Sequence, residues 1–161
     1  MKFEVMSRGK ARAFSYRPDI PDCIIVSITD CFARLNQFYP NPHIKGVLRL
    51  QFDDVDFGEE NCITEKEGQQ IVEFVNRFRD QVQEIVVHCE AGVSRSAGVC
   101  AALMKIIDGD DRPIFNNPRF CPNMACYRTV MESYYGSYDP KEADEKIAHN
   151  TKIWKEANGL D

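Results

Sequence analysis

Cys89 and Arg95, separated by five residues, are the two side chains of this sequence whose spacing is best suited to chemistry. An apolar run, Ile85-Val86-Val87, precedes them, and a second apolar stretch, Ala97 to Ile107, follows. These flanks predict a strand, a tight loop and a helix, with the thiol and the guanidinium both on the loop. A thiolate is a strong nucleophile, and a guanidinium is a planar, permanently charged fork that matches two oxygens of a phosphate. Together they could hold a phosphate dianion against a sulfur nucleophile.

The predicted loop also has the means to ionise the thiol. A free cysteine has a pKa of about 8.5, so only a few per cent is thiolate at neutral pH. A loop wound around a helix N-terminus lowers that pKa, because backbone N–H groups and the positive end of the helix dipole face the sulfur. Gly92 allows a backbone conformation that a side chain would obstruct, and Ser96 can donate its hydroxyl to the sulfur. We expect the phosphate to bind the loop residues Glu90, Ala91, Gly92, Val93, Ser94 and Arg95.

The run His88-Cys89-Glu90-Ala91-Gly92-Val93-Ser94-Arg95-Ser96 resembles the signature of the protein tyrosine phosphatase superfamily, and is closest to its compact dual-specificity branch. The resemblance implies that Cys89 attacks phosphorus and forms a phosphocysteine, which water then hydrolyses. It implies that a carboxylic acid protonates the leaving oxygen and later activates the water. It also implies that no metal or other cofactor takes part, and that His88 orients the loop rather than donating a proton.

Three aspartates follow a second predicted strand and are candidates for that acid. Asp53, Asp54 and Asp56 come directly after the run Gly46–Phe52. In the family the acid lies on the loop after the corresponding strand, and Phe52-Asp53-Asp54 resembles the family's aromatic-x-Asp sequence, with Phe in place of Trp. The resemblance favours Asp54 as the general acid, with Asp53 as the second candidate and Asp56 as the third.

Length and composition limit the remaining possibilities. The 161 residues, 43% of them hydrophobic and 28% charged, are typical of one globular domain, and we expect a single dual-specificity or tyrosine phosphatase-like domain over residues 1–161. The net charge of −5 does not favour nucleic acid or an anionic membrane, so neither is an expected partner. Seven irregularly spaced cysteines and an N-terminus without the pattern of an export signal indicate a reducing compartment, and we expect a cytoplasmic monomer.

The predicted elements alternate as in an α/β protein. Strands are predicted at Cys23–Ile28, Gly46–Phe52 and 84–88, with a weak edge strand at 2–7. Helices are predicted after a Thr64-x-x-Glu67 capping box, from the cysteine loop to a stop at Gly109 and Pro113, from Asn123 to Tyr135, and after Asp139-Pro140. We therefore predict a single-domain, three-layer α/β sandwich with a central, mostly parallel sheet flanked by helices. The phosphate loop should lie between a central strand and a buried helix.

Several functions are compatible with the loop to different degrees. The leading hypothesis is hydrolysis of phosphotyrosine, with phosphoserine and phosphothreonine as further candidates, on a phosphorylated protein or peptide. A phosphatase of phosphoinositides, nucleotides or RNA 5′ ends would be expected to carry lysines near the loop, where Glu90, Ala91 and Val93 stand. Sulfur transfer of the rhodanese type is disfavoured by Ser94-Arg95-Ser96. A phospho-ligand adaptor without catalysis is disfavoured by the intact cysteine and arginine.

Overall fold

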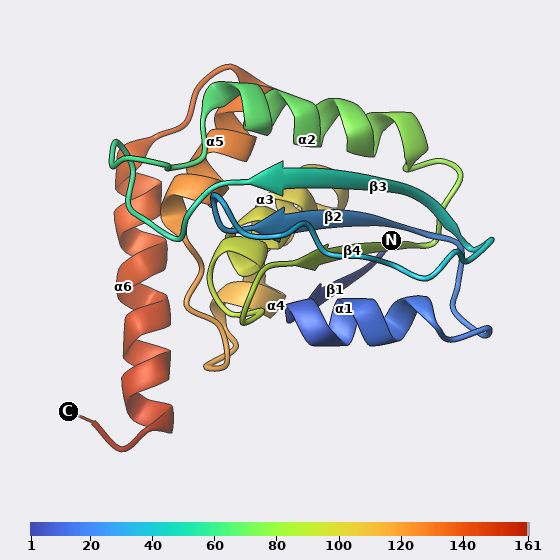
Figure 1. Cartoon of the computed structure of the whole chain (residues 1–161). Coiled ribbons are helices and arrows are strands. Elements are labelled where there is room, and N and C mark those ends of the chain that lie inside the picture. Colours follow the sequence, from blue (N-terminus) through green and yellow to red (C-terminus); the bar gives the residue numbers. More distant parts are fainter. Residues whose placement is uncertain (161) are drawn as a thin grey trace.

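A parallel sheet of four strands forms the centre of the protein (Figure 1). The structure is a computed structural model and describes residues 1–160. The strands are β1 (Lys2–Met6), β2 (Cys23–Thr29), β3 (Ile44–Gln51) and β4 (Glu84–His88). They follow the spatial order β1-β4-β2-β3, and every neighbouring pair is parallel. All four predicted strands are present, and β1 is an edge strand as predicted.

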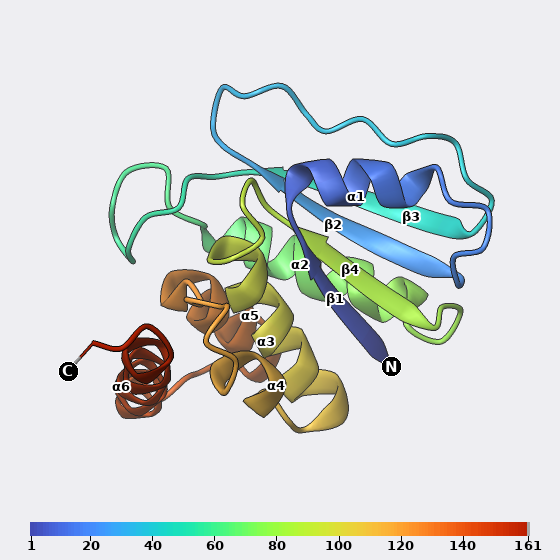
Figure 2. The ribbon, with the colours of Figure 1, turned by 90° about the horizontal axis from the view of Figure 1, so that it is seen from below.

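Six helices are present in the described part of the chain. They are α1 (Arg8–Ser15), α2 (Glu65–Phe78), α3 (Arg95–Asp108), α4 (Arg112–Phe115), α5 (Met124–Tyr135) and α6 (Pro140–Ala157). Figure 2 shows α1 on one face of the sheet and α2, α3 and α5 on the other, which gives the three predicted layers. No helix of residues 1–160 combines the length and the apolarity that crossing a membrane requires.

The central strands β2 and β4 are apolar on both faces because helices cover both faces. Every residue of these two strands is buried. Ile24 and Val26 of β2 belong to the main core with α2, α3 and α5, whereas Ile25 and Val86 pack with Phe14 of α1 on the opposite face. The carboxyl ends of β2 and β4 therefore lie side by side in the middle of the sheet, where α/β proteins place their ligand-binding loops.

The helix boundaries follow the capping residues that the sequence contains. Thr64 and Glu67 form the predicted capping box at the start of α2. The Asn123 side chain accepts a hydrogen bond from the Cys126 N–H at the start of α5. Gly109 and Gly136 end α3 and α5 with φ angles of 74° and 85°, a left-handed conformation that favours glycine.

Two helices were not predicted from the sequence. The first, α1, begins after Ser7, whose hydroxyl accepts a hydrogen bond from the Lys10 N–H. The helix has eight residues, of which only Ala11, Phe14 and Ser15 are buried, so the sequence offers few apolar positions from which to predict it. The second, α4, has a single turn, and Pro113, predicted as a stop for the preceding helix, lies in its first turn.

Candidate active site

The phosphate loop, residues 89–95, joins the end of β4 to the start of α3 at the carboxyl edge of the sheet. Several carbonyl groups of the loop accept hydrogen bonds from neighbouring segments of the chain. The carbonyls of Glu90, Val93 and Ser94 accept hydrogen bonds from the N–H groups of Arg8, Cys121 and Asn123 at 3.1, 3.1 and 3.0 Å. Because these carbonyls point outward, the N–H groups of the loop are left to face the interior of the loop.

The Cys89 thiol lies inside this loop and is only 3% exposed. Its Sγ atom is 3.0 Å from the Ser96 hydroxyl oxygen and accepts a hydrogen bond from the Gly92 N–H at 3.3 Å. Burial by itself raises the pKa of this thiol. The hydrogen bonds from the Ser96 hydroxyl and N–H, and from the N–H groups of Gly92 and Val93, outweigh burial and leave the pKa below its ordinary value.

Other buried cysteines show the effect of burial without such donors. Burial raises the pKa of Cys23 and of Cys100 to about 12, and it also raises the pKa of Cys126. Cys89 is buried to a similar degree, so the difference comes from the hydrogen-bond donors of the phosphate loop. The loop thus singles out Cys89 as the thiol most readily ionised among these buried cysteines.

Position 92 requires glycine for two reasons, its backbone conformation and its close approach to neighbouring backbone atoms. Its φ angle of +70° lies in the left-handed region that side chains rarely adopt. A Cβ atom at this position would stand 2.6 Å from the Met6 carbonyl carbon and from the Ser7 nitrogen. The phosphate loop therefore packs directly on the junction of β1 and α1, and only glycine allows that approach.

His88 supports the phosphate loop from inside the protein. Its Nδ1 is 3.0 Å from the Cys89 carbonyl oxygen, and its Nε2 is 2.7 Å from the Ser27 hydroxyl and 3.3 Å from the Asn36 side-chain nitrogen. Since the amide nitrogen of Asn36 can only donate, Nε2 accepts and Nδ1 carries the proton that bonds the carbonyl. Burial lowers the pKa of His88, which keeps the ring neutral and able to orient the start of the loop.

Arg95 is 4% exposed, and its guanidinium makes its hydrogen bond and its ion pair through Nη1. Its Nη1 donates to the Phe52 carbonyl at 2.7 Å and lies 2.6 Å from a carboxylate oxygen of Asp30. Its Nε is buried and has no hydrogen-bond partner among the described residues. A buried donor of this kind needs an acceptor, and a bound oxyanion would supply one.

Asp30 is a neighbour of this site that the sequence reasoning did not consider. It directly follows β2, and its side chain is about half exposed. The carboxyl ends of parallel strands meet at one edge of a sheet, so residues following β2, β3 and β4 come together there. That rule could have drawn attention to Asp30 as well as to Asp53, Asp54 and Cys89.

Asp54 lies against the phosphate loop. Its Oδ1 accepts hydrogen bonds from the Ser94 hydroxyl at 2.8 Å and from the Asn123 side-chain nitrogen at 2.9 Å. Both donors bind the same oxygen, so Oδ2 remains available to carry a proton. The Asn123 nitrogen also donates to the Val55 carbonyl at 3.0 Å, so this helix-capping residue additionally fixes the acid loop, residues 52–61.

The other two candidate aspartates point elsewhere. The carboxylate of Asp53 accepts hydrogen bonds from the Cys31 N–H at 2.9 Å and from the Asn61 side chain at 3.2 Å. Asp56 lies in a turn of the acid loop in which its N–H donates to the Glu59 carboxylate at 2.7 Å. Of the three candidates, Asp54 is the one whose carboxylate is hydrogen-bonded to the phosphate loop within residues 1–160.

Residues 24–109 match a known protein family, described as the dual specificity phosphatase catalytic domain. The match covers more than half of the chain, so the chain belongs to this family and is a cysteine-dependent phosphatase. This confirms the family that the sequence around Cys89 resembles. A search of curated protein sequences found no match.

Several solved structures share the fold of this chain. Human DUSP28 superposes with a TM-score of 0.56 and 17% identity, over 88% of this chain and 94% of that chain. A mouse putative dual specificity phosphatase complexed with zinc tungstate superposes with a TM-score of 0.52 and 18% identity, over 87% of this chain and 84% of that chain. PTPMT1 in complex with PI(5)P superposes with a TM-score of 0.50 and 17% identity, over 84% of this chain and 91% of that chain. The predicted fold class is therefore confirmed.

Proposed function

We propose that this chain is a protein phosphatase that hydrolyses phosphotyrosine, and that phosphoserine and phosphothreonine are secondary substrates. In this proposal Cys89 is the nucleophile, Arg95 and the amides of the phosphate loop bind the phosphate, and Asp54 is the general acid and base. The observation that carries the proposal is the environment of Cys89: a buried thiol whose pKa is lowered by loop donors, beside the unpaired Nε of Arg95.

In the first step, the Cys89 thiolate attacks phosphorus in line with the ester bond. The new bond joins sulfur to phosphorus, and the bond between phosphorus and the tyrosine oxygen breaks. The leaving phenolate takes the proton from Oδ2 of Asp54, while Arg95 and the inward-facing N–H groups hold the phosphate oxygens. The products of this step are a free tyrosine side chain, a phosphocysteine and an ionised Asp54.

In the second step, the ionised Asp54 takes a proton from a water molecule that attacks the phosphocysteine. The bond between sulfur and phosphorus breaks, phosphate leaves, and Asp54 is again protonated. The departing thiolate is stabilised by the Ser96 hydroxyl, 3.0 Å from Sγ. Each group thus returns to its initial state after one turnover.

The composition of the phosphate loop supports a protein substrate over a highly charged small one. The side chains between Cys89 and Arg95 include Glu90 but no lysine. The net charge of the chain is −5, which gives no general attraction to anionic surfaces. An extended protein segment carrying one phosphate needs only the amides of the loop and the single guanidinium at its centre.

A substrate panel tests the proposal. The wild-type protein should hydrolyse a phosphotyrosine peptide with a higher kcat/KM than matched phosphoserine and phosphothreonine peptides, inositol phosphates, nucleotides and 5′-phosphorylated RNA. Activity should be lost in Cys89→Ser, which shows that the turnover belongs to this site. A clear preference for an inositol phosphate, a nucleotide or RNA would overturn the protein-substrate proposal.

A further inference from the structure

We infer that Arg128 of α5 is a positioning residue for the general acid: it holds the Phe57 ring of the acid loop and thereby keeps Asp54 against the phosphate loop. The central carbon of the Arg128 guanidinium lies 4.2 Å from the centroid of the Phe57 ring. Phe57 is in the acid loop, three residues after Asp54. The inference rests on the proposed function, because it concerns the acid that this function assigns to Asp54.

The hydrophobic core does not fix the position of the acid loop. Phe52 and Ile63 are buried, but no residue between them, from 53 to 62, is buried. The loop borders a cavity of about 780 Å³, whose lining includes Phe57 of the loop and residues of α2 and α5. Since core packing contributes little here, the position of Asp54 depends on the few polar and aromatic contacts that the loop makes with its surroundings.

Hydrogen bonds inside the acid loop join its residues to one another. The Asp53 N–H donates to the Asn61 carbonyl at 2.8 Å, and the Asn61 side chain donates to the Asp53 carboxylate at 3.2 Å, which closes the base of the loop. The Asp56 N–H donates to the Glu59 carboxylate at 2.7 Å, and the Glu59 N–H donates to the Asp56 carbonyl at 3.1 Å. A contact at Phe57, which lies between these two bonded residues, therefore restrains the loop as a whole.

Helix α5 and its N-cap contact the acid loop at two points. The N-cap, Asn123, donates to the Asp54 carboxylate at 2.9 Å and to the Val55 carbonyl at 3.0 Å. Arg128 follows five residues later on the same helix and lies over Phe57. Residues 54–57 of the loop are therefore held at both ends by one helix.

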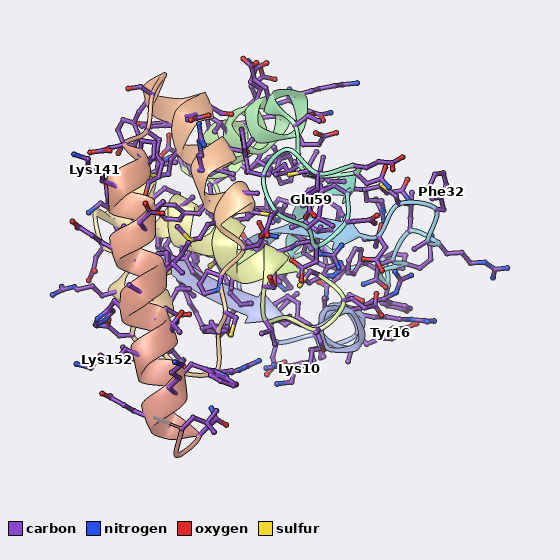
Figure 3. The ribbon with its side chains drawn as sticks, turned by 90° about the vertical axis from the view of Figure 1, so that its left-hand side faces the viewer. Lys10, Tyr16, Phe32, Glu59, Lys141 and Lys152 are labelled. Carbon is purple, nitrogen blue, oxygen red and sulfur yellow. The ribbon has the colours of Figure 1, made fainter. Side chains whose placement is uncertain are left out.

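The guanidinium of Arg128 is itself held in place. Its Nε donates to Oε1 of Glu132, one turn further along α5, at 2.7 Å. A cation over the face of an aromatic ring is attracted by the negative charge of the π-system, and the 33% exposure of Arg128 leaves this attraction partly shielded from water. Figure 3 shows the acid loop, labelled at Glu59, beside α5. Arg128 thus acts on the reaction through Phe57.

The experiment measures kcat for a phosphotyrosine peptide in variants of the two residues. Phe57→Ala and Arg128→Ala should each lower kcat by about threefold, the equivalent of one exposed cation–π contact, with KM little changed. Phe57→Tyr keeps the aromatic ring and should keep the wild-type kcat. The matched control is Arg119→Ala, which removes an arginine that lies over the ring of Phe120 at 5.3 Å and should leave kcat unchanged.

Two further measurements separate positioning of the acid from a general loss of structure. The loss in Arg128→Ala should be larger for the phosphotyrosine peptide than for p-nitrophenyl phosphate, because a poorer leaving group depends more on the proton of the acid. In an Asp54→Asn background, Arg128→Ala should have no further effect on kcat, since no acid remains to be positioned. The double variant Phe57→Ala/Arg128→Ala should lose no more activity than either single variant.

Three results would overturn the inference and leave the proposed function intact. They are wild-type kcat in Phe57→Ala and Arg128→Ala, equal losses for the two substrates, and a loss from Arg128→Ala that persists in the Asp54→Asn background. Wild-type activity of Asp54→Asn alone would instead overturn the role that the proposed function gives to Asp54. The two failures are distinguishable because the second does not involve Phe57 or Arg128.

Discussion

The donors around one sulfur atom distinguish Cys89 from the other buried cysteines of this chain. Burial raises the pKa of Cys100 to about 12, yet it does not prevail at Cys89, where Ser96, Gly92 and Val93 supply hydrogen bonds. The identities of Cys89, Ser96 and Gly92 were enough to predict this from the sequence. The identity of the general acid was not settled, because three aspartates within four positions differ only in how the loop turns.

The contacts of the aspartates predict which one acts as the acid. Asp54→Asn should lower kcat about 100-fold, because a positioned acid contributes on the order of 10²- to 10⁴-fold. The loss should be larger for phosphotyrosine than for p-nitrophenyl phosphate, whose leaving group needs less protonation. Asp53→Asn is the matched control and should retain most of the activity. Equal losses in the two variants, or a loss in Asp53→Asn alone, would contradict the assignment.

The contact between Asp30 and Arg95 leads to a second prediction at the residue scale, on the affinity for phosphate. The Asp30 carboxylate lies 2.6 Å from Nη1 of Arg95 and partly neutralises the cation that would bind phosphate. Asp30→Asn keeps an oxygen that can accept from Nη1 but removes the negative charge. The inhibition constant for inorganic phosphate should therefore fall, by about threefold to tenfold. A higher inhibition constant in Asp30→Asn would show that the charge of Asp30 is needed to hold Arg95 in place.

At the scale of elements, the candidate active site is formed by the segments that follow the carboxyl ends of β2, β3 and β4. The sequence predicted β2, β3 and β4 from apolar runs and predicted the helices that begin with clear caps, because these signals are local. It did not predict α1, which has few buried residues, and so the hydrogen bond from the Arg8 N–H to the Glu90 carbonyl of the phosphate loop was not foreseen. The contacts of Asn36 with Arg8 and His88 were not foreseen either. Contacts between segments distant in sequence depend on the packing of those segments and leave little local signal.

The attachment of α6 gives a prediction at this scale. Asp111 is buried and accepts hydrogen bonds from the Tyr127 hydroxyl at 2.6 Å and from Lys146 of α6 at 2.8 Å. Asp111→Ala should lower the free energy of unfolding by about 3 kcal/mol, because it leaves an amine and a hydroxyl without their acceptor. Denaturant titration measures this loss. Asp110→Ala removes an exposed ion pair with Arg112 and an exposed hydrogen bond from the Arg112 N–H, so it should change stability much less, and a comparable loss there would contradict the assignment.

At the scale of the whole molecule, the net charge of −5 conceals a division of charge around the active site. Arginines line a pocket beside the phosphate loop, whereas glutamates line the larger cavity beside the acid loop. The net charge alone does not predict this division of charge. It could not locate the arginine pocket, because Arg8, Arg12 and Arg34 come together only when α1 and the segment after β2 are placed.

A buried carboxylate at the opposite end of the sheet links stability to pH. Burial raises the pKa of Glu84, although Lys2 lies 3.3 Å away. A carboxyl group with a raised native pKa stabilises the protein below its unfolded pKa, and this contribution is lost as pH rises through the native value. Glu84→Gln should therefore be at least as stable as the wild type at pH 7 and lose that advantage as pH falls toward 4.

Thermal unfolding over this pH range measures the effect. Glu73→Gln is the control, since Glu73 is exposed on α2 and should leave the pH profile of stability unchanged. A Glu84→Gln protein that is clearly less stable than the wild type at pH 7, with no narrowing of the difference at low pH, would contradict the predicted cost of the buried charge.

The most direct test of the central claim is the pH dependence of alkylation of Cys89 by iodoacetamide, followed by mass spectrometry of the modified peptide. The midpoint should lie below the value of about 8.5 for an ordinary thiol, and it should move to higher pH in Ser96→Ala. Prior incubation with vanadate should protect Cys89 in the wild type. A midpoint at or above that of free cysteine would contradict the claim that the phosphate loop holds a thiolate ready to attack phosphorus.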